Sequence, residues 1–224
     1  VAKLVRPEDA EQAAAPERER YSWVTYPKLA RTILRSLPWR VALDIETDGL
    51  DPYTCRILTL QVSGQAGPGY SFPWDLLTPA EWAQALGARE WVFQNGSFVL
   101  AANGVFLKIA EDTMLIHSLV DETPGTHSME QMAHRYLGVE KWTELVDYER
   151  MGEVNAEDLA KYGARDADLT LRLATVFRPV VQGRYINDVL HGLQNALLRA
   201  ELRGVRVNRE LADQFDREIE SALH

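Results

Sequence analysis

Two acidic side chains, Asp44 and Glu46, lie in a segment whose pattern suits metal-assisted chemistry. Residues 41–46 alternate apolar and other side chains with period two, which predicts a β-strand. Residues two apart leave the same face of a strand, so both carboxylates point one way while Leu43 and Ile45 point into a core. Neighbouring carboxylates repel each other unless a cation or a proton lies between them. Alone, however, the pair is more typical of a solvated sheet face than of a metal site.

Tyr162 and Asp166 form a second candidate group on a predicted helix. The amphipathic pattern over residues 156–177 indicates a long helix that stops before Pro179. Residues four apart share one helix face, so the phenol and the carboxylate can reach one site. Taken alone, the pair is typical of a half-buried tyrosine beside a surface aspartate.

The elements that would position these groups are strands in the first half of the chain and helices in the second. Strands are predicted over residues 41–46, 56–62, 70–74 and 91–93. Helices are predicted over residues 26–37, from Thr78 as N-cap, over 113–119 with Asp112 as cap, and over 127–137, 156–177, 185–203 and 209–224. This order predicts an α/β fold with a mixed central sheet flanked by helices and a helical C-terminal segment.

Composition restricts the classes of protein. The chain has 224 residues, 46% of them hydrophobic, which allows one ordinary domain with appended pieces. No apolar run approaches the 18 or so residues of a membrane span, so no membrane association is expected. The chain begins with Val1, not Met, and is expected to come from a longer protein. Its one cysteine, Cys55, excludes an internal disulfide and a cysteine-based zinc site and fits a reducing cytoplasm.

Charge and histidine spacing narrow the choice further. The net charge of -9 argues against coating of nucleic acid but suits an enzyme that takes one strand end and leaves the phosphate to cations. A cytoplasmic monomer is expected. The histidines have no ligand spacing in the sequence, and we expect them to pack or to lie at the surface.

Together the motifs resemble the 3′→5′ exonuclease domain of family A DNA polymerases. The matching segments are Asp44 to Thr47, Glu111 to Leu115 and Tyr162 to Leu173. The resemblance covers about residues 39–180, and residues 193–208 resemble the start of the polymerase region. It implies a ribonuclease H-like exonuclease fold with three parts: an arm and lead-in helix over 1–38, the exonuclease domain over 39–180, and the start of the polymerase region over 181–224.

The resemblance also implies a mechanism. Members of the family hydrolyse the 3′ end of single-stranded DNA with two Mg²⁺ or Mn²⁺ ions. By this resemblance Asp44 would bridge both ions, Glu46 and Asp166 would hold the ion that activates water, and Tyr162 would orient that water. The substrate-binding residues would be Thr47, Leu50, Asn95 and Phe98. The implied partners are a single-stranded DNA 3′ end and the remainder of the polymerase chain.

The family pattern breaks in the second motif, where Asp should follow Phe98. Val99 stands there instead, and the spacing from Asn95 to Gly104 is about three residues short. Loss of Asp with two following residues explains both facts, whereas a substitution explains only the first. The second ion is therefore expected to be held weakly and hydrolysis to be impaired. Two alternatives stay open: a non-catalytic module that binds a strand end or supports the polymerase, and an RNA-trimming exonuclease of the same superfamily.

Overall fold

The structure is a computed structural model that describes residues 20–49, 51–96, 98–140, 146, 148–181 and 185–223. Residues 1–19, which hold almost all of the predicted arm, and the candidate substrate-binding residue Leu50 lie outside the described residues. One sheet contains β1 (Arg20–Trp23), β2 (Arg40–Thr47), β3 (Ile57–Ser63), β4 (Pro68–Pro73), β5 (Glu90–Phe93) and β6 (Ile109–Asp112).

The α-helices are α2 (Pro27–Ser36), α3 (Pro79–Leu86), α4 (Phe98–Ala102), α5 (Thr113–Val120), α6 (Met129–Leu137), α7 (Ala156–Val181), α8 (His191–Arg203) and α9 (Arg209–Leu223). Two short 3₁₀ segments, η1 (Trp74–Leu76) and η3 (Tyr148–Glu153), and a π-helical segment, η4 (Tyr185–Leu190), complete the described elements.

The sheet is mixed, as the sequence predicts. Its strand order is β1-β4-β3-β2-β5-β6, with β3 antiparallel to both β2 and β4 and the other neighbours parallel. In this register Asp44 lies opposite Gln61 and Glu46 lies opposite Thr59. The pairing of β2 with β5 ends at Ala42, so β3 alone pairs with the strand at the two acidic residues.

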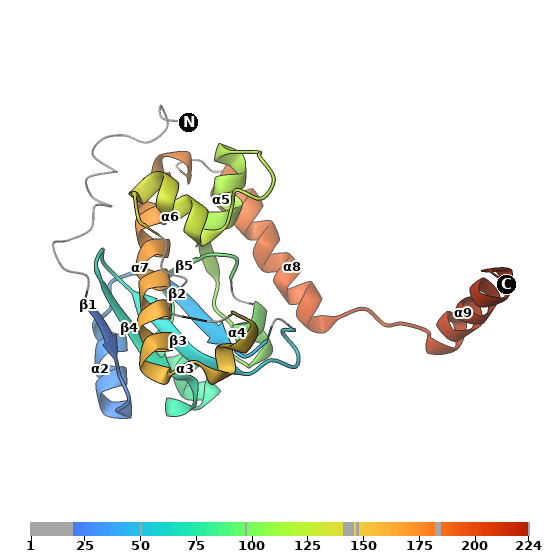
Figure 1. Cartoon of the computed structure of the whole chain (residues 1–224), viewed down its shortest axis with the longest axis horizontal. Coiled ribbons are helices and arrows are strands. Elements are labelled where there is room, and N and C mark those ends of the chain that lie inside the picture. The colour runs from blue at the N-terminus through green and yellow to red at the C-terminus, as the bar shows by residue number, and fades with distance from the viewer. Residues whose placement is uncertain are drawn as a thin grey trace.

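Helices cover both faces of the sheet (Figure 1). Helix α7 lies across one face and contacts β1, β2, β3 and β4. The main hydrophobic core lies on the other face, where residues of α2 and α3 such as Leu34 and Trp82 pack with Leu43 and Leu60 of the sheet. This two-sided burial leaves β2 no solvent face of its own, so a polar group on it needs a specific reason.

Close packing holds α7 on the sheet. A Cβ added to Gly69 on β4 would lie 2.4 Å from the backbone oxygen of Ala164, so only glycine allows the helix to come this near. The buried Asp168 carboxylate accepts hydrogen bonds from Gly67 N at 2.6 Å and from Tyr21 Oη at 3.2 Å. These contacts fix both the height and the rotation of α7 above the sheet.

Helix α7 runs further than expected: the sequence predicts an end before Pro179, but Pro179 lies inside the last turn of the helix. A proline near the C-terminus of a helix removes one intrahelical hydrogen bond but need not end the helix. Val176 and Phe177 are buried against Ile116 and Met132, and this packing holds the last turn in place.

The C-terminal helices differ in their surroundings. Helix α8 packs against β6 and α4, and Leu198 on it belongs to the main core. Helix α9 is exposed along its whole described length and stands apart from the sheet (Figure 1). The three-part division of the chain remains a prediction. In the described part of the chain no helix is both long enough and apolar enough to cross a membrane.

Candidate metal centre

Alternation along β2 places the acidic pair. Ala42 packs with Leu171 and Ala174 of α7, whereas Leu43 and the partly buried Ile45 join the core on the opposite face. Because strand side chains alternate, Asp44 and Glu46 emerge on the same face as Ala42, toward α7. The sequence prediction for this strand therefore holds in the structure.

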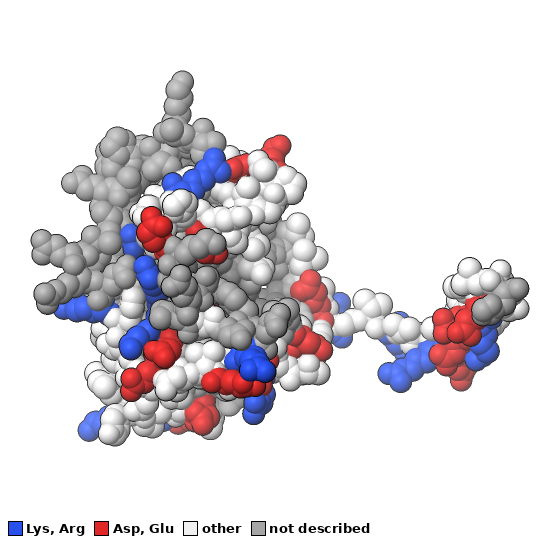
Figure 2. All heavy atoms as spheres, viewed as in Figure 1, with Lys and Arg blue, Asp and Glu red and all other residues white. Residues whose placement is uncertain are grey.

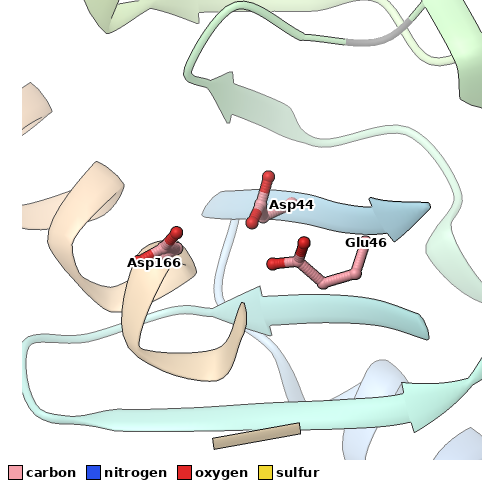
Figure 3. A group of neighbouring side chains, drawn as sticks. All are labelled: Asp44, Glu46 and Asp166. Atoms are coloured by element: carbon pink, nitrogen blue, oxygen red, sulfur yellow. The ribbon is translucent and has the colours of Figure 1, made fainter. Parts of the chain in front are cut away.

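Helix α7 brings a third carboxylate to the same point. Asp44, Glu46 and Asp166 each offer a carboxylate oxygen, and these atoms all lie within 4.8 Å of one another. Figure 3 shows the three side chains turned toward one another between β2 and α7. Glu46 and Asp166 are buried, with 8% and 9% of their surface exposed, and Asp44 is partly exposed. Carboxylates this close share one electrostatic environment.

Burial and mutual repulsion disfavour the charged forms. Burial raises the pKa of Asp44 to about 7, although a hydrogen bond from the Ile45 backbone acts in the opposite direction. The pKa of Glu46 is raised well above its ordinary value by burial first, and then by the negative charges of Asp44 and Asp166. A bound cation would stabilise the ionised forms of these carboxyl groups, because its positive charge offsets the repulsion between the carboxylates.

A pocket of about 220 Å³ opens beside this cluster, and Asp44 forms part of its wall. The pocket lies between the end of β2 and the turn that links β5 to α4. Several residues predicted to bind substrate line it, together with the residue at the broken motif: Thr47, Asn95, Phe98 and Val99. The pocket thus gathers most of the predicted substrate contacts next to one carboxylate of the cluster.

Tyr162 lies one helical turn before Asp166 on α7, as the spacing predicts. It is buried in a cluster with Met151, Leu159 and Leu169. Its predicted role in orienting water stays a prediction, as do the roles of the other site residues.

The structure adds Tyr53, which the sequence motifs do not single out. Its ring meets Phe98 edge to face, with centroids 5.5 Å apart, and its hydroxyl donates a hydrogen bond to the Glu201 backbone oxygen at 3.2 Å. Tyr53 is 67% exposed and contacts the pocket through Phe98, which lines it. The sequence signal that could have indicated Tyr53 is its position as an aromatic residue in the loop after the strand of Asp44 and Glu46.

Two histidines also meet, in a packed position of the kind expected for histidines here. His117 Nδ1 and His127 Nδ1 lie 2.7 Å apart, and His117 Nε2 lies 3.0 Å from the Tyr136 hydroxyl. Burial lowers the pKa of His117, and the positive charge of a protonated His127 lowers it further. This pair belongs to the packing of α5 and α6, and the acidic cluster is made by other residues.

A family model described as 3′-5′ exonuclease matches residues 21–182, which is most of the chain. The chain belongs to the 3′-5′ exonuclease family of family A DNA polymerases. Among curated proteins, a DNA polymerase I of Rhizobium leguminosarum is 29% identical to this chain over 132 residues, covering 54% of the chain and 13% of the relative. The curated relatives that the chain matches are much longer, since 13 to 21% of their length is aligned.

Solved structures share the fold. The POL domain of Pol1 from M. smegmatis, in complex with DNA primer-template and dNTP, has a TM-score of 0.69 at 18% identity, covering 89% of this chain and 35% of that chain. RNase D of Escherichia coli, an exoribonuclease involved in structured RNA processing, has a TM-score of 0.64 at 17% identity, covering 84% and 52%. At these identities the likeness establishes the ribonuclease H-like exonuclease fold and no more.

The acidic cluster of this chain fits a divalent cation. Carboxylate oxygens are the ligands that hard divalent ions prefer. Three such groups within 4.8 Å, two of them buried, would be strained without positive charge among them. The described residues supply three ligands here, and Val99 gives the neighbouring pocket an apolar wall.

Proposed function

We propose that this chain removes nucleotides from the 3′ end of single-stranded DNA by metal-dependent hydrolysis, as the proofreading region of a DNA polymerase. The observation that carries the proposal is the cluster of Asp44, Glu46 and Asp166 beside the pocket between β2 and α4. Membership of the 3′-5′ exonuclease family supports the reaction class. The cations are proposed to be Mg²⁺ or Mn²⁺, because both accept carboxylate and water ligands.

The chain's own residues divide the work. Asp44, Glu46 and Asp166 would hold the ions, which supply charge stabilisation and an activated water when bound. Phe98 and Asn95 would hold the terminal nucleotide, with the ring of Phe98 stacking on the base, an interaction that tolerates any sequence. Tyr162 would orient the attacking water from α7. Thr47 Oγ1 donates to Gly49 O at 2.7 Å. This bond fixes the end of β2, where the 3′ end of the DNA would enter.

Absence of the expected Asp after Phe98 sets the proposed level of activity. One preorganised electrostatic group is typically worth about 10² to 10³ in rate. We therefore propose slow hydrolysis by the chain as it stands, and recovery when Asp and two following residues are inserted after Phe98.

The test is a gel assay on a labelled DNA strand with Mg²⁺ or Mn²⁺, comparing the chain, the insertion variant and Asp44→Ala as the background. Activity above that background, and a gain of about a hundredfold on insertion, is expected. Equal metal-dependent activity in both forms would show that another residue replaces the missing ligand. A matched RNA strand tests the alternative substrate, since faster RNA cleavage would reassign the chain to RNA trimming.

One specific observation favours a second candidate, a module that binds a strand end without cutting it. The apolar side chain of Val99 lines the pocket at the position where the family pattern has Asp. Binding of a single strand in the presence of metal, with no cleavage by either the chain or the insertion variant, would favour this candidate.

We also propose that the chain works as part of a longer polymerase. Helix α9 exposes an apolar stripe at four-residue spacing, made by Leu211, Phe215, Ile219 and Leu223, which are 46 to 78% exposed. Such a stripe normally packs against a partner surface. The remainder of the polymerase chain is the partner that its relatives suggest.

A further inference from the structure

The turn between β5 and α4 holds Asn95 in a rare backbone conformation. Its φ is 55°, and in the described parts of the chain no other residue except glycine has a positive φ. Asparagine tolerates this left-handed region better than most residues, but the conformation persists only where the surroundings impose it. Beside it, a Cβ on Gly96 would lie 2.4 Å from the Phe93 ring, so the turn is also packed tightly.

The carboxylate of Asp112 holds this turn. Asn95 N donates to Asp112 Oδ1 at 3.2 Å, and Gly96 N donates to Oδ2 at 3.3 Å. The same carboxylate caps α5 by accepting from Met114 N at 3.0 Å and Leu115 N at 3.3 Å. Asp112 is 2% exposed, so these bonds form away from water. The sequence predicts that Asp112 caps α5, but it does not predict the hydrogen bonds from Asn95 and Gly96 to the same carboxylate.

Helix α8 reaches the same carboxylate from the other side. Gln194 Nε2 donates to Asp112 Oδ2 at 2.7 Å, a shorter distance than any of the four backbone bonds. The backbone N of Asp112 donates to His191 Nε2 at 3.1 Å. Asn195 pairs with Ile109, accepting from its N at 2.9 Å and donating to its O at 2.8 Å, as a neighbouring strand would. Helix α8 is thus fastened to the edge of the sheet.

We propose that Asp112 and Gln194 are positioning residues that couple helix α8 to the substrate pocket. Gly96 N and Gln194 Nε2 donate to the same oxygen of Asp112, so a displacement of α8 would alter the bond that fixes the turn. Asn95 and Gly96 line the pocket beside Asp44. Helix α8 lies beyond residues 21–182 that match the exonuclease family, so the pocket depends on a segment outside that family's match.

The inference rests on the proposed function only in naming the ligand of the pocket as a DNA strand end. The coupling itself is a property of the fold and can be measured without catalysis. The coupling and the proposed function can therefore fail separately.

The variants are Gln194→Leu, which removes the donor from α8, and Asp112→Asn, which replaces one acceptor oxygen by an NH₂ group. Glu201→Gln, at an exposed position on the same helix, is the matched control. Amide hydrogen exchange is followed at Asn95 and Gly96, with Val92 in β5 as an internal reference. A hydrogen bond to a charged group is typically worth a tenfold change or more in an opening equilibrium. We expect exchange at Asn95 and Gly96 to quicken about tenfold in both variants but not in the control.

Four results would decide whether α8 is coupled to the pocket. Quickened exchange confined to the turn supports the coupling, and weaker binding of a labelled single-stranded oligonucleotide, with an unchanged thermal shift on adding Mn²⁺, extends it to the substrate. Unchanged exchange in the folded Gln194→Leu variant overturns it, as does an equal change at Val92, which would indicate general loosening. If exchange responds but the unaltered chain binds no DNA, the coupling stands and the proposed function fails.

Discussion

Replacing Asp44 by Asn should stabilise the metal-free protein at neutral and alkaline pH. Burial raises the pKa of Asp44 from 3.8 to about 7 in the fold. Between these values the unfolded chain has released its proton while the folded chain retains it. The contribution of Asp44 to stability is therefore greatest below pH 3.8 and falls until the pH passes about 7. Asparagine keeps the shape of the side chain and cannot ionise.

The magnitude follows from the size of that rise. At about 1.4 kcal/mol for each tenfold change in protonation, a rise from 3.8 to about 7 corresponds to about 4 kcal/mol at pH 8. Asp44 and Glu46 repel each other, so the value belongs to the pair and removal of one charge also relieves the other. For a chain of this size 1 kcal/mol changes Tm by about 2–4 °C. We expect Tm of Asp44→Asn to exceed that of the unaltered protein by about 8–16 °C at pH 8.

The assay is thermal unfolding in a chelator between pH 5 and pH 8, repeated with Mn²⁺. The advantage of Asp44→Asn should narrow toward pH 5. Mn²⁺ should stabilise the unaltered protein more at pH 8 than at pH 5, because protons compete for the same oxygens. It should leave the variant almost unchanged.

Asp48→Asn is the matched control. Hydrogen bonds from Arg56 lower the pKa of Asp48, whereas burial raises that of Asp44. The control should lose stability, not gain it. If Asp44→Asn is less stable than the unaltered protein at pH 8 without metal, the carboxylate cluster is not strained and the reasoning is refuted.

Three further changes test the packing around the site. Gly69→Ala forces a Cβ to within 2.4 Å of the Ala164 oxygen; it should cost about 1–3 kcal/mol in urea unfolding and weaken Mn²⁺ binding, and unchanged metal affinity would show that α7 need not lie so close. Leu198→Ala should cost about 2–5 kcal/mol, while its exposed neighbour Leu197→Ala should stay within about 0.5 kcal/mol, and equal losses would contradict the burial of α8. Phe98→Ala should raise KM for a single strand more than it lowers kcat, because stacking of the ring is proposed to bind the base; a fall in kcat alone would count against stacking.

The acidic cluster could be anticipated because its pattern is local. Period two in β2 fixes the shared face of Asp44 and Glu46, and four-residue spacing aligns Tyr162 with Asp166 on α7. The start of α3 at Thr78 could be predicted in the same way, and in the structure Thr78 and Glu81 form a complete capping box. Each of these signals lies within one element and needs no knowledge of what packs against it.

Features that depend on partners distant in sequence could not be anticipated. The sequence does not predict the edge strands β1 and β6, since β1 pairs with β4, which begins only at Pro68, and β6 runs directly into α5. The meeting of His117 with His127 arises from the packing of α5 against the segment before α6. The contact between Tyr53 and α8 joins residues 148 positions apart.

The fold and the missing ligand are separable on physical grounds. The groups that hold α7 to the sheet are Asp168, Tyr21 and the glycines at 69 and 163, none of which belongs to the acidic cluster. The cluster itself opposes folding at neutral pH, because its members are buried and alike in charge. Val99, where the family pattern has Asp, packs as a partly buried residue against the main core. A chain can therefore lose a carboxylate at this position without losing its fold, and the loss is expected in metal binding and rate alone.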